Sequence, residues 1–91
     1  MAKSSISPGF HALSEPIRIQ IIDLLKSGNE LCVTTLCDSL GIQQSKLSFH
    51  LKTLSQSGLV TSRREGRRIY YSLNMAQFSF LEAYLSEVQE V

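Results

Sequence analysis

The chain has 91 residues and a mass of 10.2 kDa, which is enough for one small domain and leaves no room for a second. Hydrophobic residues make up 43% of it, a share that suits a folded protein rather than a disordered one. The net charge is only +1, but residues 43–68 carry +5, residues 1–42 carry −1 and residues 69–91 carry −3. A basic middle between mildly acidic ends predicts a partner that carries phosphate.

The sequence offers little that would support an enzyme or a membrane protein. It has no Gly-rich phosphate loop, its only histidines are His11 and His50, and no Ser/His/Asp or His/Cys cluster has a workable spacing. Residues 1–5 lack the apolar run of a secretory signal, and no stretch is long enough to cross a bilayer. We therefore expect a cytoplasmic protein without a membrane partner, in which the two cysteines are free thiols.

The first third of the chain is predicted to be mostly helical. Residues 5–13 are expected to form a short helix, and Ser14 is a natural N-cap for a stronger one whose apolar residues recur at helical spacing. Residues 30–33 are expected to be extended, and Thr34 or Thr35 can cap the helix that follows.

A tight turn at Gly41 then joins that helix to a longer one over residues 44–57. Two helices joined by a short turn that contains glycine are the signature of a helix-turn-helix.

The hydrophobic pattern then changes from helical to alternating. Residues 59–63 and 68–73 are expected to be two strands, joined by a hairpin turn in which Gly66 can adopt a positive φ. A last helix is expected over residues 75–90. The order of elements predicts a mainly α fold with a small β-hairpin wing, a winged helix-turn-helix that occupies residues 1–91 as a single domain.

The 44–57 helix has one apolar and one polar face. Leu47, Leu51 and Leu54 share the apolar face and are expected in the core, while the opposite face contains no acidic residue. Gln can bond adenine, Ser and Lys can bond bases or phosphates, and Phe can contact a thymine methyl group. His50, at the edge of the apolar face, is expected to pack or to form a hydrogen bond there. The predicted DNA contacts of this helix are Gln44, Ser45, Lys46, Ser48, Phe49 and Lys52.

The hairpin is also basic. Arg63, Arg64, Arg67 and Arg68 flank its tip, and only Glu65 opposes them. Long cationic side chains on a hairpin can reach the backbone or the minor groove of a duplex. Arg67 and Arg68 are predicted to contact DNA.

A chain of this size buries only about 60% of its unfolded surface and is marginal as a monomer. The last helix carries apolar residues on two flanks, and one flank would stay wet in a monomer. We therefore expect a homodimer formed by residues 5–13 and 75–90. A two-fold axis would set two DNA-reading helices about 34–36 Å apart, in successive major grooves. The predicted interface residues are Phe10, Leu13, Phe78, Leu81, Leu85 and Val88.

Four segments in order resemble the ArsR/SmtB-type family of metalloregulatory repressors. They are residues 13–18 (LSEPIR), 30–33 (ELCV), 44–51 (QSKLSFHL) and 66–73 (GRRIYYSL). The resemblance implies a homodimer that binds an inverted-repeat operator and leaves it when an inducer binds. It also implies that Gln44, Ser45, Ser48 and Phe49 are major-groove contacts, although many members carry His or Arg where Phe49 stands.

Residues 30–37 (ELCVTTLC) are similar to the arsenic-sensing pattern Glu-Leu-Cys-Val-Cys-Asp-Leu-Cys of this family. Cys32 and Cys37 match its first and last cysteines, and Thr34 replaces the central one. The resemblance implies that trivalent arsenic or antimony could act as inducer at Cys32 and Cys37, with no cofactor required. Thr34 would be a poor third ligand, because a neutral hydroxyl binds soft metals weakly. Cys37 can equally be a small apolar residue, and Cys32, near a helix N-terminus, is the better reactive thiol.

Two functions of different classes remain open from the sequence. The first is a DNA-binding repressor that a thiophilic inducer such as arsenite or antimonite releases. The alternative is a winged-helix regulator with no metal sensing, either redox-responsive or a protein-interaction module. Steep salt dependence of binding would indicate DNA.

Overall fold

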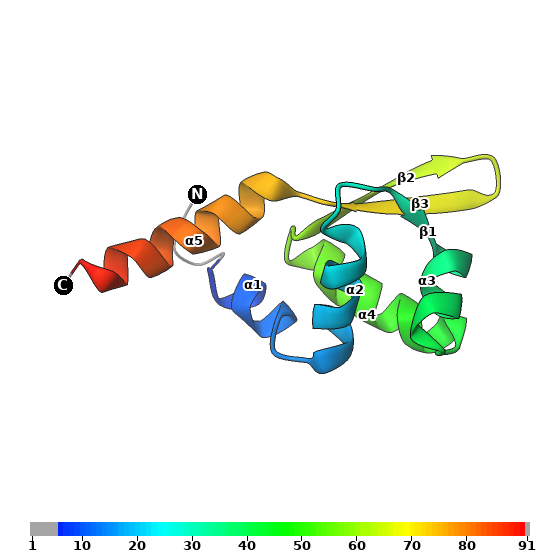
Figure 1. The fold of residues 1–91 in the computed structure, drawn as a ribbon, viewed down its shortest axis with the longest axis horizontal. Helices are drawn as coiled ribbons and strands as arrows, with labels where there is room; N and C mark the ends of the chain where they lie inside the picture. The colour runs from blue at the N-terminus through cyan, green and yellow to red at the C-terminus, as the bar shows by residue number, and fades with distance from the viewer. Residues whose placement is uncertain (1–5, 91) are drawn as a thin grey trace.

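The protein, seen here in a computed structural model that describes residues 6–90, is elongated, with extents of 47 × 24 × 23 Å (Figure 1). Ser5, expected to begin the first helix, lies outside the described residues. Helices and one three-stranded antiparallel sheet, in the order β1-β3-β2, form the predicted winged helix-turn-helix. None of the described helices is both long and apolar enough to span a bilayer. The elements are α1 (Ile6–Ala12), α2 (Pro16–Leu25), β1 (Leu31–Cys32), α3 (Val33–Leu40), α4 (Gln44–Gln56), β2 (Val60–Glu65), β3 (Arg68–Leu73) and α5 (Met75–Gln89).

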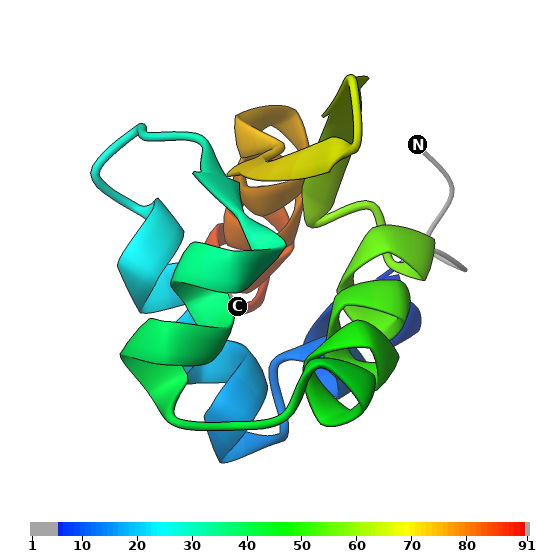
Figure 2. The same cartoon turned by 90° about the vertical axis from the view of Figure 1, so that its right-hand side faces the viewer.

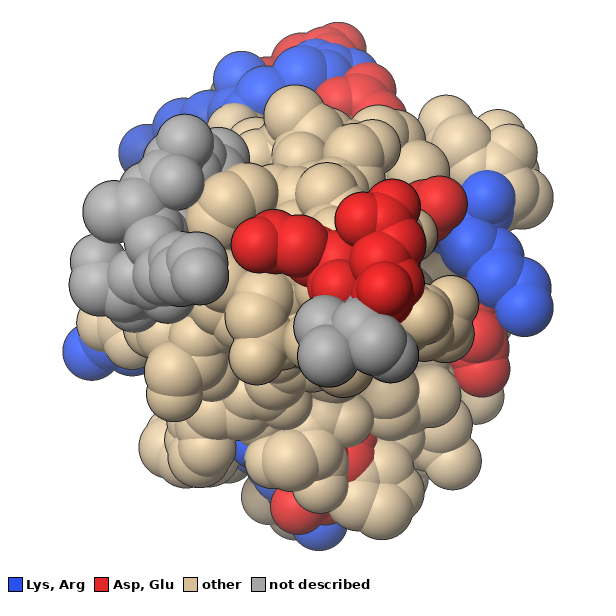
Figure 3. All heavy atoms as spheres, turned by 90° about the vertical axis from the view of Figure 1, so that its left-hand side faces the viewer, with Lys and Arg blue, Asp and Glu red and all other residues tan. Residues whose placement is uncertain are grey.

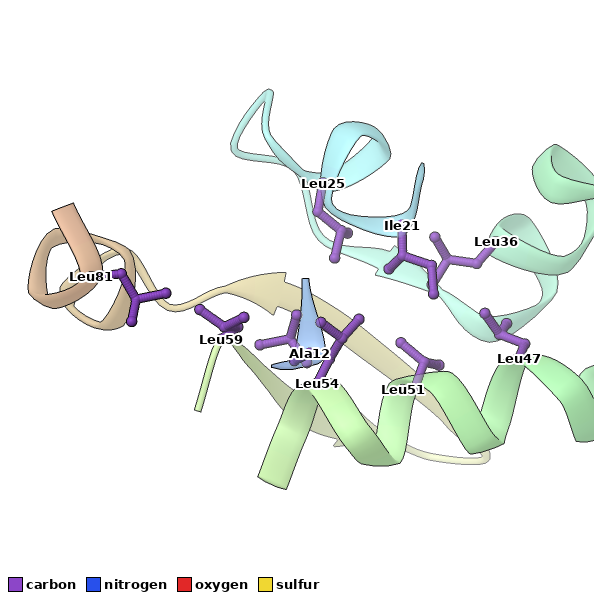
Figure 4. Packing of buried hydrophobic residues seen from close by; sticks show 10 residues of the cluster. Ala12, Ile21, Leu25, Leu36, Leu47, Leu51, Leu54, Leu59 and Leu81 are labelled. Atoms are coloured by element: carbon purple, nitrogen blue, oxygen red, sulfur yellow. The ribbon is translucent and has the colours of Figure 1, made fainter. Parts of the chain in front are cut away.

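The core lies between α4 and the pair of helices that precede it. Leu47, Leu51 and Leu54 are at most 1% exposed, which confirms the predicted apolar face of α4. Figure 4 shows these side chains directed at Ile21 and Leu25 of α2, and at a leucine of α3. Because one face of α4 is buried in the core, the opposite face must point to solvent.

Strand β1 joins the hairpin to the helix-turn-helix. Its two residues pair with β3, Leu31 opposite Tyr71 and Cys32 opposite Tyr70. Residues opposite each other share a face of the sheet, so Leu31 and Tyr71 pack on the core while Cys32 and Tyr70 lie on the outer face. The extended segment is shorter than predicted, because α3 begins at Val33.

Two predicted helix caps are wrong. Thr34 and Thr35 lie inside α3, whose N-cap is the extended residue Cys32. The hydroxyl of Ser14 donates to the carbonyl of His11 (2.6 Å) and so satisfies the end of α1. Pro16 occupies the first turn of α2, where its fixed φ suits a helix start without a side-chain cap.

Helix α1 packs closely on α5. A Cβ atom built on Gly9 would lie 2.9 Å from a methyl carbon of Leu81, and Leu81 is only 4% exposed. Leu81 was predicted at the dimer interface, and this is corrected: its side chain is used in the core of its own protomer, because glycine lets the two helices approach closely. The ring of Phe10 stacks beside Tyr84 of α5 at 6.3 Å between centroids.

The other predicted interface residues divide into two groups. Leu13 and Phe78, like Phe10, are half-buried against the protomer's own core. Leu85 and Val88, toward the end of α5, are 48% and 52% exposed. Figure 3 views the molecule from this end, where acidic side chains gather near the C-terminus and much of the remaining surface is uncharged.

Candidate nucleic-acid interface

Helix α4 offers its outer face to solvent over its first two turns. All six residues predicted there to contact DNA, from Gln44 to Lys52, are exposed, and the helix contains no acidic residue. Gly41 adopts φ +66° and its amide bonds to the carbonyl of Cys37 (2.8 Å), which ends α3 and turns the chain into α4. Figure 2 looks from the hairpin side and shows α3 and α4 joined by this turn below the hairpin.

The first turn of α4 has amides that no side chain caps. Its N-cap is Gln43, an extended residue without a side-chain cap hydrogen bond. Free amides and the positive end of the helix dipole favour an anion at this position. The start of α4 can therefore face the phosphate backbone or an acceptor on a base edge.

Phe49 is the large apolar residue of this face. Its side chain is 64% exposed, and its ring meets the ring of His50 edge-on, with 5.2 Å between centroids. An aromatic ring held outward on an otherwise polar helix can contact the methyl group of thymine in the major groove.

His50 itself is not exposed to a ligand. It is 6% exposed, and its Nδ1 lies 3.1 Å from a guanidinium nitrogen of Arg18, which is also 6% exposed. Because arginine can only donate, Nδ1 must accept, and the ring is neutral with its proton on Nε2. Burial, and then the charge of Arg18, lowers the pKa of His50. The expectation that His50 bonds at the helix edge is confirmed.

Arg18 links three helices and was missed in the sequence. Its Nε donates to the carbonyl of Ala12 (2.7 Å) at the end of α1, and its two other guanidinium nitrogens contact the carbonyl of His11 (3.4 Å) and His50 on α4. The sequence carried a signal, because Arg18 lies three residues before Ile21 and seven before Leu25, on the buried stripe of α2. A cation on such a stripe needs buried acceptors.

On the hairpin, Arg63 is held in ion pairs with two carboxylates. Its guanidinium bonds to Glu30 (2.8 Å) and Glu65 (2.7 Å) and lies over the ring of Tyr70. Glu65, followed by Glu30, raises the pKa of Arg63. The role of Glu30 was also missed, because nothing in the sequence pairs residues 33 positions apart.

Three arginines of the hairpin remain available. Within the part of the chain that the structure describes, Arg64, Arg67 and Arg68 form no ion pair with a carboxylate, and all three are exposed. Gly66, at φ +63°, makes the two-residue turn between the strands, as predicted. The hairpin tip and the outer face of α4 together make a positive surface suited to phosphates.

The two cysteines differ in their surroundings. Cys37 is half-buried against the core, whereas the sulfur of Cys32 lies 3.3 Å from the hydroxyl of Thr35. That hydroxyl, followed by the backbone amides of the first turn of α3, lowers the pKa of Cys32, and the charge of Arg68 adds a smaller effect. Cys32 is thus the more reactive thiol.

A three-thiolate metalloid centre does not fit the described residues of one protomer. Thr34 supplies no sulfur, and residues 6–90 contain no group of three His, Cys, Asp or Glu side chains placed to hold a metal ion. Two thiolates leave a soft metalloid one ligand short of the site that the resemblance implies.

Comparison with known proteins places this interface in a family. The sequence model for "Bacterial regulatory protein, arsR family" matches residues 15–62, which contain α2, α3 and α4. The chain belongs to the arsR family of bacterial regulatory proteins. It is a family of transcriptional regulators and not of enzymes.

Individual proteins are similar to this chain over most of its length. The arsenical resistance operon repressor of Staphylococcus xylosus is 39% identical over 74 residues, which is 81% of this chain and 70% of that protein. HlyU from Vibrio cholerae superposes with a TM-score of 0.77 at 32% identity, covering 92% of this chain and 94% of that one. A homodimeric winged helix-turn-helix DNA-binding domain from Mycobacterium bovis superposes with a TM-score of 0.77 at 28% identity. The superposition covers 96% of this chain and 81% of that one.

Proposed function

We propose that this arsR-family protein is a transcriptional repressor that binds an inverted-repeat duplex operator as a homodimer, in the cytoplasm. The observation that carries the proposal is the acid-free outer face of α4 beside three hairpin arginines that form no ion pair with any carboxylate of residues 6–90. Side chains able to bond base edges lie on α4, and cations that can reach phosphates lie on the hairpin. In the proposed complex Gln44, Ser45, Ser48 and Phe49 face the major groove, and Lys46, Lys52, Arg67 and Arg68 face the backbone.

A dimer is the assembly that this reading requires. The homodimeric relative from Mycobacterium bovis supports it, as does the exposure of Leu85 and Val88 on α5. In the proposed dimer, α1 and α5 of one protomer pack against the same helices of the other. Leu85 and Val88 lie at this interface, and the exposed edges of Phe10, Leu13 and Phe78 add to it. Leu85→Glu should lower the apparent mass in sedimentation to that of a monomer. An unchanged dimer mass would place the interface elsewhere.

Release from DNA is proposed to act through the thiols. The similarity to the Staphylococcus xylosus repressor makes arsenite and antimonite the first compounds to test at Cys32 and Cys37. Because the residues do not fit a three-thiolate centre, no step of the release is assigned to a bound metalloid. Comparing operator release from wild type and Cys32→Ser, with and without arsenite, tests the role of Cys32: equal release from both would remove it from sensing.

The function itself is tested by DNA binding. Selection from a randomised duplex library, followed by footprinting, should return an inverted repeat whose half-sites lie about one helical turn apart. Affinity should fall steeply as salt rises. A winged-helix module that binds another protein would give no footprint and no enriched duplex.

A further inference from the structure

A hollow of about 280 Å³ lies where α3, α4 and the hairpin meet. Cys32 at the end of β1 and the first two residues of α3, Val33 and Thr34, form one wall, and Gln44 at the start of α4 forms another. Arg67, Arg68 and Ile69 close it from the hairpin. A water takes a share of about 30 Å³ in the liquid, so this volume has room for a phosphodiester group with several waters. The hollow lies beside the proposed DNA-facing surface, because Gln44, Arg67 and Arg68 belong to both.

The lining of the hollow is positive. Neither Arg67 nor Arg68 has a carboxylate partner within residues 6–90, and none of the residues that line it is acidic. The nearby Arg63 differs, since its guanidinium forms ion pairs with Glu30 and Glu65. No side chain caps the first turns of α3 and α4, both of which border the hollow. Two arginines and the uncapped start of α4 line one space, next to the α3 amides that face the sulfur of Cys32, and such a lining suits a phosphate oxygen.

Cys32 forms part of the wall of this hollow. It is the N-cap of α3, and Arg68 lies close enough for its charge to act on the thiol. The sheet register fixes its place, because Cys32 pairs with Tyr70 of β3, two residues along the strand from Arg68. A change of charge at residue 32 therefore acts on the wall of the hollow, beside Arg68.

We propose that this hollow seats one backbone phosphate of the bound duplex, and that a negative group at position 32 weakens DNA binding by competing with that phosphate. The inference rests on the proposed function, because it assumes that the same face binds DNA. It adds a route for regulation: any modification that leaves an anion on the sulfur of Cys32 repels the duplex directly, without a third metal ligand.

The decisive comparison is Cys32→Asp with Cys32→Asn. Asp and Asn are equally good N-cap residues, so both variants should keep α3 folded, and they differ by one negative charge. Binding of a labelled mixed-sequence duplex to the full chain, followed by fluorescence anisotropy at about 50 mM salt, reports phosphate contacts without requiring the operator. Ser39→Asp and Ser39→Asn form the matched control, because Ser39 lies on α3 and lines a different groove, toward α2.

We expect Cys32→Asp to bind the duplex at least about tenfold more weakly than Cys32→Asn, since two anions that share one small hollow repel each other. The difference should shrink as salt rises, and the Ser39 pair should differ by no more than about twofold. Equal affinities for the two Cys32 variants, with normal binding by wild type, would overturn the phosphate seat and leave the proposed function intact. Absence of duplex binding by wild type would overturn both the phosphate seat and the proposed function.

Alkylation separates the DNA phosphate from free phosphate as the occupant. In a Cys37→Ala background, the sulfur of Cys32 forms a bond to the methylene carbon of iodoacetamide, and iodide is released. The duplex should slow this reaction at least about threefold, whereas inorganic phosphate at matched ionic strength should not. An unchanged rate with the duplex, or equal protection by phosphate alone, would contradict a seat reserved for DNA.

Discussion

Replacing Arg67 and Arg68 together by glutamine should make DNA binding much less dependent on salt. Each protomer presents five exposed Lys and Arg side chains that form no ion pair within the described residues. Each phosphate that a cation neutralises contributes about −0.9 to the slope of log K against log salt. The five cations are Lys46, Lys52, Arg64, Arg67 and Arg68.

The magnitude follows from that number. Ten such cations in a dimer set an upper limit of about −9 for the wild-type slope, and removal of four leaves about −5. Between 50 and 200 mM salt, wild type should lose about 10⁵ in affinity and the Arg67→Gln/Arg68→Gln variant about 10³. Fluorescence anisotropy with one labelled duplex across that range measures both slopes.

Arg63→Gln is the matched control, because it is the same substitution on the same hairpin. Glu30 and Glu65 hold the guanidinium of Arg63, so its removal should change the slope by less than about one. Equal slopes for wild type and the double variant would refute the assignment of the hairpin to the DNA backbone. A fall of the slope in Arg63→Gln as large as in the double variant would show that ion pairing does not decide which arginines bind.

Three further outcomes test other parts of the structure. The free energy of unfolding should decrease as the pH is lowered from 7 to 5. The pKa of His50 is lower in the folded protein than in the unfolded chain, so the unfolded chain takes up the proton first and is stabilised by it. His50→Gln, which keeps an acceptor for Arg18, should lose this part of the dependence in urea titrations, and an unaltered profile would contradict the reasoning. Gly9→Ala should cost about 1–3 kcal/mol in the same assay, since its Cβ would meet Leu81 at 2.9 Å; an unchanged midpoint would mean that α1 and α5 can separate freely. Thr34→Cys should bind arsenite at least about tenfold more tightly than wild type by calorimetry, because it supplies a third soft ligand, and equal affinities would show that two thiols suffice.

The helices and the hairpin could be predicted from the sequence because their signals are local. Leu47, Leu51 and Leu54 repeat at helical spacing, and Gly66 allows the tight turn that joins the strands. Their neighbours along the chain determine these features, so no knowledge of distant contacts was needed. The caps were less certain, because a serine such as Ser14 can satisfy the end of one helix as readily as the start of the next.

The candidate site was predicted less completely, because contacts between residues far apart in the sequence help to decide which of its arginines are paired and which are available. The four hairpin arginines look alike in the sequence, and Arg63 differs from the others because Glu30, 33 residues earlier, joins the nearby Glu65 in binding its guanidinium. The contact of Arg18 with His50 likewise joins residues 32 positions apart. The burial of Leu81 depends on how closely α1 approaches α5, which no periodicity of α5 alone can give.

The direct passage from β1 into α3 has a mechanical consequence for the hairpin. Helix α3 starts at the residue after Cys32, and no loop lies between them to absorb a displacement. The base of the hairpin is therefore stiff, and a shift of its central strand moves the front of α3 with it. Lengthening the tip around Gly66 would change only how far the hairpin reaches, whereas one residue inserted before Val33 would uncouple the front of α3 from the movements of that central strand.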